Sequence, residues 1–321
     1  MPRLHGVFET STYFAFGVNP ATGEISGPDG TGVIVSRESA SLPGLRHLYA
    51  VTNHHISVRG NLSMVRLNTT DGKSRRLAFE PEEWTFLGNG HDIAVIDITD
   101  EVTQSDEISA IPETMFVTDE FISRVDLGLG EDVFMVGMFA DFSNSERNAP
   151  FSRFGNLSRM ADPRTPIKCG GYGPRASHVV DMRSRTGFSG SPVWVFRTPS
   201  GDLEGIIEDG GWNLDTWNNL FVRLLGVHCG QFPEMVKASK SASAEIHGDQ
   251  IKEGDELWIP GGMTVVVPAC CISELLNSPS LEAQRRDRDT QPKRLEEYAA
   301  WQGKMGMPNT GGYPSSFKLK L

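Results

Sequence analysis

The feature of this sequence that most restricts its fold is a series of short apolar runs with Gly, Pro, Asn and Asp between them. Many short runs at this spacing are typical of the strands of a β-sandwich or β-barrel. The runs do not alternate with long helical segments, which disfavours a parallel α/β sheet. We therefore predict an all-β protein, with strands at residues 13–18, 31–35, 48–51, 64–67, 93–98, 133–138, 178–180, 193–196, 220–228, 257–259 and 264–267.

The composition limits the size and the partners of the protein. The chain has 321 residues, enough for a large core in one or two domains, and its 34 Gly and 19 Pro suit a turn-rich β protein. A formal net charge of −11 argues against nucleic acid as the main partner, because nucleic-acid binders usually present a basic face. No run of about 18 apolar residues is present, so we expect no membrane span.

The stretch from Arg185 to Val193 carries the most specific motif of the chain. Its sequence, R-T-G-F-S-G-S-P-V, places Ser189 between two glycines and ahead of the apolar run at 193–196. Glycines there let the backbone turn tightly and direct its N–H groups to one point beside the serine hydroxyl. A serine is a weak nucleophile unless a base takes its proton, so a histidine and an aspartate should lie elsewhere. The alternative is a turn serine in a glycine-rich hairpin.

Both partners are present upstream, in the order His, Asp, Ser. The apolar run at 48–52 leads into His54 and His55, and Asp92 stands at the start of the run at 93–98. The same three side chains occur in several chain orders on unrelated folds. In α/β-hydrolases the histidine comes last, so this order disfavours an esterase or acyltransferase of that fold.

With these three motifs together, the chain resembles trypsin-like (chymotrypsin-fold) serine peptidases of the bacterial type. V-T-N-H-H resembles the family's V-T-x-x-H and puts the catalytic histidine at His55. H-D-I-A-V-I resembles its D-I-A-V strand and puts the aspartate at Asp92. G-F-S-G-S-P resembles its G-x-S-G-x-P and puts the nucleophile at Ser189.

The resemblance covers about residues 8–277, with looser matches at 30–35, 130–137 and 225–230. It implies two six-stranded antiparallel β-barrels with the three residues in the cleft between them, followed by a C-terminal helix at 268–276. The expected domains are an N-terminal barrel at 1–118 that carries His and Asp, and a C-terminal barrel at 119–277 that carries Ser and the specificity pocket. Residues 278–321 are expected to form a charged, partly disordered tail, with a helix at 295–301.

The resemblance also implies a role for each residue. Ser189 attacks the carbonyl carbon of a peptide bond, His55 takes its proton, and Asp92 orients the imidazole. The N–H groups of Gly187 and Ser189 form the oxyanion hole. The expected activity is that of a serine endopeptidase acting on a protein or peptide, without metal or cofactor. The alternative is a protease-fold module that binds a partner, either catalytically idle or activated by that partner through the tail or the inserts.

Three neighbouring residues raise questions. His54 would point to the opposite side of the chain from His55, so we expect it to be structural. Asp97 lies an odd number of positions from Asp92, on the other face of the same strand, and cannot replace it without a change of register. Phe188 stands where animal digestive members carry an aspartate that pairs with a freshly cut N-terminus. We therefore expect no zymogen cleavage in this chain. The sequence leaves open what holds the oxyanion loop in place.

Substrate specificity follows only from a local resemblance. His228, in G-V-H-C-G, resembles a strand of bacterial glutamyl endopeptidases and of picornaviral processing proteases, in which this histidine contacts the acidic or amide side chain before the cut. Ser184 stands where those families have a Thr, while Arg183 and Gly230 complete the expected pocket. The alternatives are a buried strand histidine and an Arg183 that faces solvent. Inserts at 200–219, which is acidic, and 237–256 could gate this pocket or decorate the surface.

The cysteines indicate the compartment. Cys169, Cys229, Cys270 and Cys271 show no metal-ligand spacing, and the adjacent pair can hardly form a disulfide with itself. We read them as reduced, buried thiols of a cytoplasmic protein. The N-terminal residues lack an apolar secretion segment, which agrees with that expectation.

Overall fold

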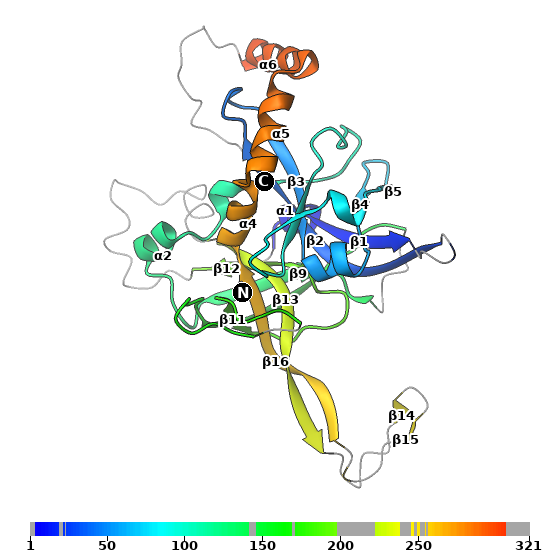
Figure 1. The fold of residues 1–321 in the computed structure, drawn as a ribbon, viewed down its shortest axis with the longest axis vertical. Coiled ribbons are helices and arrows are strands. Elements are labelled where there is room, and N and C mark those ends of the chain that lie inside the picture. The colour runs from blue at the N-terminus through cyan, green and yellow to red at the C-terminus, as the bar shows by residue number, and fades with distance from the viewer. Residues whose placement is uncertain are drawn as a thin grey trace.

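The computed structural model describes residues 4–18, 22, 24–140, 146–168, 171–197, 222–237, 245–246, 249–250, 254 and 256–305 (Figure 1). The N-terminal half contains α1 (Gly6–Thr10), β1 (Thr12–Val18), β2 (Ile25–Glu38), β3 (Arg46–Thr52), η1 (His55–Arg59), β4 (Met64–Asn68), β5 (Ser74–Leu77), η2 (Pro81–Glu83), β6 (Thr85–Phe86), β7 (Ala94–Asp97) and β8 (Ile111–Pro112). The C-terminal half contains η3 (Glu113–Met115), α2 (Asp119–Val125), β9 (Asp132–Gly137), β10 (Phe151–Arg159), β11 (His178–Asp181), β12 (Pro192–Phe196), β13 (Val222–Lys237), β14 (Glu245–Ile246), β15 (Asp249–Gln250), β16 (Glu256–Pro268), α4 (Ala269–Leu276), α5 (Pro279–Asp289) and α6 (Pro292–Met305).

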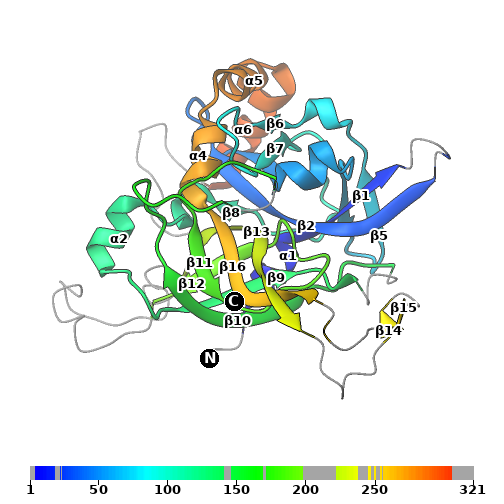
Figure 2. The ribbon, with the colours of Figure 1, turned by 60° about the horizontal axis from the view of Figure 1, so that its bottom comes forward.

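The strands form two main sheets that lie side by side (Figures 1 and 2). The C-terminal sheet is a closed barrel in the order β10-β11-β16-β13-β12-β9. The N-terminal sheet runs β5-β4-β1-β2-β3-β7-β6, and β8 pairs in parallel with β2. The predicted all-β fold class is confirmed, and the C-terminal sheet is a six-stranded antiparallel barrel as predicted. The N-terminal sheet differs in detail from a six-stranded barrel, because its path has seven strands and its end strands β5 and β6 do not pair.

Strands at the junction of the two sheets are buried on both faces, because successive side chains on a strand point to opposite sides. On β2, Val33 and Val35 pack into the cluster between the two halves, whereas Ile34 packs inside the N-terminal sheet. On β9, Phe134 belongs to the cluster between the halves and Met135 to the interior of the barrel. This double burial explains why these strands appear in the sequence as continuous apolar runs.

The predicted strands match the structure in position, but not all strands could be predicted. Strand β10 is absent from the prediction because its sequence, F-S-R-F-G-N-L-S-R, is polar and only Leu157 is fully buried. Two of the predicted strands, at 257–259 and 264–267, are one long strand, β16. Together with β13 it extends beyond the barrel as a two-stranded ribbon (Figure 1). The insert at 200–219, and most of the one at 237–256, lie outside the described residues.

The predicted C-terminal helix is present as α4, with Ile272, Leu275 and Leu276 buried between the two halves. The expected helix at 295–301 lies within α6, whereas the rest of residues 279–305, expected to be flexible, is also helical and forms α5 and the ends of α6. Charged residues mislead here, because high charge is typical of solvated tails while these charges have partners in the N-terminal sheet. Residues 306–321 lie outside the described part of the chain.

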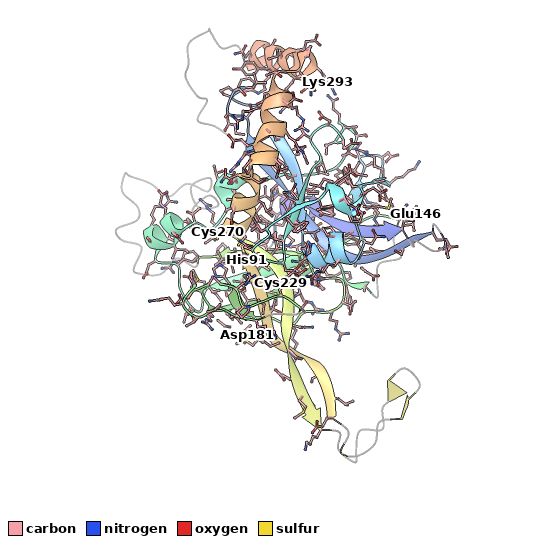
Figure 3. All side chains as sticks on the ribbon, in the orientation of Figure 1. His91, Glu146, Asp181, Cys229, Cys270 and Lys293 are labelled. Carbon is pink, nitrogen blue, oxygen red and sulfur yellow. The ribbon has the colours of Figure 1, made fainter. Side chains whose placement is uncertain are left out.

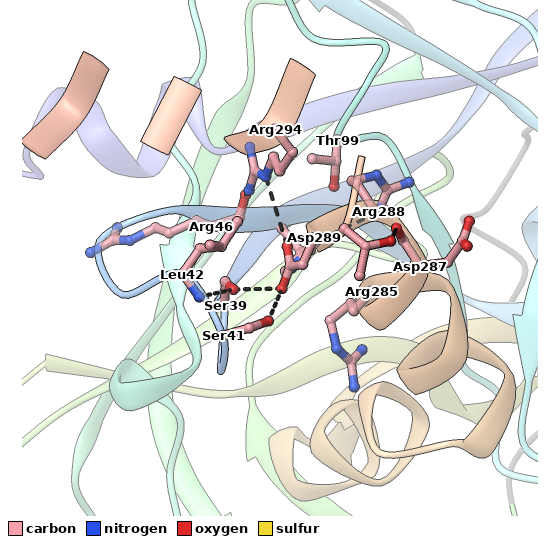
Figure 4. Close-up of polar contacts among 12 residues, drawn as sticks. Ser39, Ser41, Leu42, Arg46, Thr99, Arg285, Asp287, Arg288, Asp289 and Arg294 are labelled. Carbon is pink, nitrogen blue, oxygen red and sulfur yellow. Dashed lines mark hydrogen bonds and ion pairs between the residues drawn. The ribbon is translucent and has the colours of Figure 1, made fainter. Parts of the chain in front are cut away.

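The contact of α5 with the N-terminal sheet is a buried polar network around Asp289 (Figure 4). Its carboxylate accepts hydrogen bonds of 2.6 Å from Ser39 Oγ and 2.7 Å from Ser41 Oγ. His47 Nε2, on β3, lies 3.2 Å from the other carboxylate oxygen. Arg288 Nη1 donates a 2.6 Å bond to Asp97 on β7. The helix therefore holds the ends of β3 and β7, the two strands that carry His55 and Asp92 at their opposite ends.

The cysteine expectation holds in part. Cys270 and Cys271 are free thiols, Cys229 is half-buried, and Cys169 lies outside the described residues. Cys271 is buried, but Cys270 is exposed, so the expectation of burial is wrong there. Within the described ranges, no helix has the length and apolar character that would let it cross a membrane.

Candidate active site

The pairing of β3 with β7 brings His55 to Asp92. The two strands are antiparallel, with Thr52 opposite Ala94, so the residues that follow β3 face the residues that precede β7. His55 Nδ1 lies 2.6 Å from Asp92 Oδ2, and the His55 backbone N–H donates a 2.9 Å bond to Asp92 Oδ1. Asn53 Nδ2 donates a 2.9 Å bond to the Asp92 carbonyl. The carboxylate thus contacts both the ring and the backbone of one histidine.

These contacts define which nitrogen of the His55 ring carries the proton. Asp92 is only 6% exposed, and a carboxylate accepts hydrogen bonds without donating any. Its contact with Nδ1 therefore assigns the proton to that nitrogen, which leaves His55 Nε2 as the acceptor. The His55 side chain is 32% exposed, so the ring faces the surface of the junction with its free edge. This arrangement suits a general base.

Two successive turns shape the loop of Ser189. The Phe188 N–H donates a 3.2 Å bond to the Arg185 carbonyl, and Gly187, third in that turn, has φ +97°. The Ser191 N–H donates a 3.0 Å bond to the Phe188 carbonyl, and Gly190, third in the second turn, has φ +85°. A positive φ at the third position is the type II geometry that favours glycine. The motif thus needs both of its glycines.

The turns leave two backbone donors beside Ser189. Within the described residues, the N–H groups of Gly187 and Ser189 donate no backbone hydrogen bond. The Ser189 side chain is half-buried, and its hydroxyl makes no hydrogen bond to His55. In structures without substrate such contacts are often long, and they shorten when substrate binds.

Thr31, on β2, joins the Ser189 loop to the N-terminal sheet. Its N–H donates a 2.8 Å bond to the Ser189 carbonyl, and its hydroxyl donates a 2.7 Å bond to the Gly187 carbonyl. The Thr31 carbonyl accepts a 2.6 Å bond from Thr52 Oγ1 at the end of β3. A Cβ on Gly190 would lie 1.8 Å from the Thr31 carbonyl oxygen, so only glycine permits this approach. The loop of Ser189 is thereby fixed against the strand that leads to His55.

The side chain of Phe188 holds the Ser189 loop in place in this chain. This side chain is fully buried in the cluster inside the C-terminal barrel. The Arg153 guanidinium lies 5.6 Å from the centre of its ring. A Cβ on Gly137 would lie 2.9 Å from the same ring, which shows how closely β9 approaches it. In this chain the loop is therefore held by an apolar side chain in the barrel core, and an ion pair of the kind that an aspartate would form is not needed.

His228 lies directly behind the Ser189 loop. Its N–H donates a 2.9 Å bond to the Ser191 carbonyl, and its carbonyl accepts a 2.9 Å bond from the Gly190 N–H. The ring is 3% exposed, and neither ring nitrogen has a hydrogen-bond partner of acceptable geometry. Burial, followed by the charge of His55, lowers the pKa of His228 to about 4, although the Phe188 carbonyl opposes that shift. At neutral pH this ring is uncharged.

The other predicted pocket residues are more dispersed. Ser184 is buried, three residues after the end of β11 at Asp181 and four residues before Phe188. Arg183 is exposed, and no described contact joins it to His228. Gly230 lies on β13, half-buried, opposite Val265 of β16. Figure 3 shows Cys229, from the same strand, and His91, from the loop before Asp92, in the central region where the two halves meet.

The rival residues have partners of their own. Asp97 lies at the far end of β7, where it accepts the bond from Arg288. His54 Nδ1 lies 2.8 Å from the hydroxyl of Tyr172, a residue that the sequence analysis missed. The one local signal for Tyr172 is its position as an aromatic residue among glycines, in G-G-Y-G-P. In the described part of the chain, no three His, Cys, Asp or Glu side chains gather as a metal site requires.

Comparison with known proteins gives matches at the level of structure. No protein-family model matches the chain, and no curated protein matches it. Among solved structures, the apo MamO protease domain from Magnetospirillum magneticum matches at 16% identity and a TM-score of 0.43, over 86% of this chain and 100% of that one. The active form of the Rv3671c protease from M. tuberculosis matches at 15% identity and a TM-score of 0.42, over 84% and 81% of the two chains.

A second structure of Rv3671c, an inactive form in which one serine is replaced by alanine, matches at 15% identity and a TM-score of 0.41, over 89% and 90% of the two chains. All three are remote from this chain in sequence, and all three TM-scores are below 0.5. The roles of individual residues therefore depend on the geometry of this chain itself.

Proposed function

We propose that this chain is a trypsin-like serine endopeptidase that cleaves peptide bonds through an acyl-enzyme. One observation carries the proposal: Asp92 holds His55 at two points, and a double glycine turn leaves the N–H groups of Gly187 and Ser189 without a backbone partner among the described residues. A base, a nucleophile and two backbone donors are the parts that acyl transfer requires.

In the proposed mechanism, the peptide carbonyl lies against Ser189 with its oxygen toward the N–H groups of Gly187 and Ser189. Ser189 Oγ attacks the carbonyl carbon as His55 Nε2 takes the hydroxyl proton. Asp92 stabilises the resulting imidazolium through its 2.6 Å contact with Nδ1. His55 gives its proton to the leaving amine, the C–N bond breaks, and water then hydrolyses the acyl-enzyme by the same route. Each oxyanion donor contributes about 3 kcal/mol in comparable enzymes.

We also propose that His228 contacts the side chain before the cut, with Gln, Glu or Asp preferred. The support is a buried ring behind the Ser189 loop, whose nitrogens have no hydrogen bond of good geometry within the described residues, and a buried Ser184 in the segment before that loop. A buried donor without a partner is costly, and a bound amide or carboxyl oxygen would satisfy it. Because His228 is neutral at pH 7, an amide suits the pocket without a change of charge, whereas a carboxylate would have to raise the pKa of the ring. Arg183, being exposed, is not part of this argument.

The test is digestion of a mixed peptide library by the purified chain, with cuts read by mass spectrometry and Ser189→Ala as the control. We expect cuts that disappear in the Ser189→Ala variant and that follow Gln, Glu or Asp. Cuts that remain in this variant would contradict the assignment of Ser189. Cuts after unrelated residues would contradict the role of His228 alone.

A second candidate is a protease-fold module that is idle or requires activation by a partner. The observation that favours it is the absence of a hydrogen bond between the Ser189 hydroxyl and His55. A fluorophosphonate probe separates the candidates, because it labels a serine only when base and oxyanion hole are assembled. Labelling of Ser189 in the isolated chain would exclude an idle site.

A further inference from the structure

A loop of the C-terminal barrel reaches the N-terminal sheet beside His55. It connects β10 to β11, and its contact residue is Tyr172. The Tyr172 hydroxyl lies 2.8 Å from His54 Nδ1, and the two rings meet edge to face with centroids 5.9 Å apart. The Arg59 guanidinium lies 4.6 Å from the centre of the Tyr172 ring. Tyr172 therefore touches both ends of the segment 54–59, in which His55 is the second residue.

The same loop makes a second contact, with the segment that precedes Asp92 and β7. A Cβ on Gly90 would lie 2.2 Å from Arg175 Nη2, so the guanidinium packs directly on that backbone. Burial, and next the charge of Arg175, lowers the pKa of His91. Gly90 and His91 immediately precede Asp92. The loop thus contacts the segments on both sides of the His55–Asp92 hydrogen bond.

The protonation states support a hydrogen bond between uncharged groups at His54. Burial comes first and the charge of Arg59 second in lowering the pKa of His54, against the opposing effect of Asp92. Burial, then the charge of Asp92 and a hydrogen bond with its side chain, raise the pKa of Tyr172, which keeps its hydroxyl protonated. The Tyr172 hydroxyl and Nδ1 of a neutral His54 therefore share one hydrogen bond, whose direction depends on the His54 tautomer. The His54 ring also packs on Phe86, with centroids 4.4 Å apart.

We infer that Tyr172 is a positioning residue for the His55–Asp92 pair, acting through its hydrogen bond to His54; the inference builds on the proposed function. His54 and His55 are consecutive, so a ring held between Tyr172 and Phe86 fixes the peptide that leads into His55. That peptide carries the N–H that bonds Asp92 Oδ1. Residues that hold a reacting group in place through a second layer of contacts preserve its geometry between turnovers.

The first test compares Tyr172→Phe with a matched control, Tyr49→Phe. The control removes a hydroxyl that accepts a 3.1 Å bond from Arg285, away from the site. We expect Tyr172→Phe to lower kcat about tenfold, with KM changed less than about twofold, because one hydrogen bond is lost while the ring stays in place. The low-field proton NMR signal of His55 Nδ1–H should shift or broaden in Tyr172→Phe and stay unchanged in Tyr49→Phe.

The second test asks whether His54 and Tyr172 act through the same hydrogen bond. His54→Ala should lower kcat as much as Tyr172→Phe, and the double variant should show no further loss, because both changes remove one interaction. His54→Asn, whose amide group can replace Nδ1 as either acceptor or donor, should restore part of the activity. Independent losses that multiply in the double variant would overturn the path through His54.

Two results would overturn the role of Tyr172 itself. One is a Tyr172→Phe variant with unchanged kcat and an unchanged Nδ1–H signal. The other is a raised KM with an unchanged kcat, which would make Tyr172 a substrate contact. If the unmodified chain neither cuts peptides nor reacts with the fluorophosphonate probe, the proposed function fails. The NMR signal still decides whether Tyr172 holds the His55–Asp92 pair, since it needs no turnover.

Discussion

Thr31 Oγ1 lies 2.7 Å from the carbonyl oxygen of Gly187 and donates a hydrogen bond to it across the junction of the two halves. Thr31 Oγ1 also accepts a 2.9 Å bond from the N–H of Met138, the residue after β9. One buried hydroxyl therefore connects β2, the end of β9 and the Ser189 loop. A residue of the N-terminal sheet therefore holds the peptide between Gly187 and Phe188, next to the Gly187 N–H that we propose as an oxyanion donor.

Replacement of Thr31 by Val should separate the loop from the N-terminal sheet while keeping the volume of the side chain. We expect a loss of about 1–3 kcal/mol in the free energy of unfolding, because a buried acceptor and a buried donor lose their partner. The rate of fluorophosphonate labelling of Ser189 should fall at least about tenfold. Thr12→Val, which removes a 2.9 Å bond to the Phe8 carbonyl outside the site, is the control for urea denaturation and labelling. Equal labelling rates in the two variants would contradict this role of Thr31.

Phe188 should be essential for stability as well as for the site. Truncation to Ala removes a fully buried ring from the barrel core and should cost about 3–5 kcal/mol of unfolding free energy, measured by urea denaturation. Phe86→Ala, at a position that is 47% exposed, provides the matched control and should change stability by less than about 1 kcal/mol. A Phe188→Ala variant as stable as the control would show that the loop does not depend on this anchor.

The network at α5 predicts that the C-terminal helices stabilise the N-terminal sheet. Asp289→Asn should lower the unfolding free energy by about 2–3 kcal/mol, since two hydrogen bonds to a buried charge weaken together. The control is Glu282→Gln on the same helix, which removes only an exposed pair with Arg286 and should have an effect near zero. If the two variants melt alike, α5 contributes no more than a surface helix would.

Stability should fall as the pH is lowered from about 6.5 to about 4, because His178 and His228 are buried in their neutral forms. Burial lowers the pKa of each to about 4. A histidine whose folded pKa is depressed binds its proton preferentially in the unfolded state, so acid favours unfolding throughout this range. The loss per histidine is on the order of 3 kcal/mol at most, and urea denaturation at several pH values would measure it.

His178 allows a specific check of that pH dependence. Its Nδ1 accepts a 3.0 Å bond from the Ala161 N–H, an acceptor that protonation would remove. His178→Asn keeps an acceptor in about the same place and does not titrate. The slope of stability against pH should therefore be smaller in the variant between pH 6.5 and 4. A slope equal to that of the unmodified chain would contradict the assignment of a neutral buried His178.

Local sequence patterns predicted those parts of the fold that depend on local chemistry. The run at 133–138 is apolar because both faces of β9 are buried, and the glycines at 187 and 190 are required by the positive φ of two adjacent turns. Strand β10 escaped prediction because its hydrogen bonds to β9 and β11, and not its own side chains, hold it in the barrel. The charged segment of α5 was misread because the partners of Arg288 and Asp289 lie on strands far away in the sequence.

The candidate site also has features that the sequence determined and features that only the tertiary structure decided. The sequence by itself determined which residue types occur together: a serine between glycines, a histidine after one apolar strand and an aspartate before another. The resemblance pointed to His55 rather than His54, but only the tertiary structure brings its ring to Asp92, because the register of β3 on β7 sets which side chain faces the carboxylate. It also decided that Tyr172 and Thr31 cross the junction to hold the site, since contacts between distant segments leave no periodic trace in either segment.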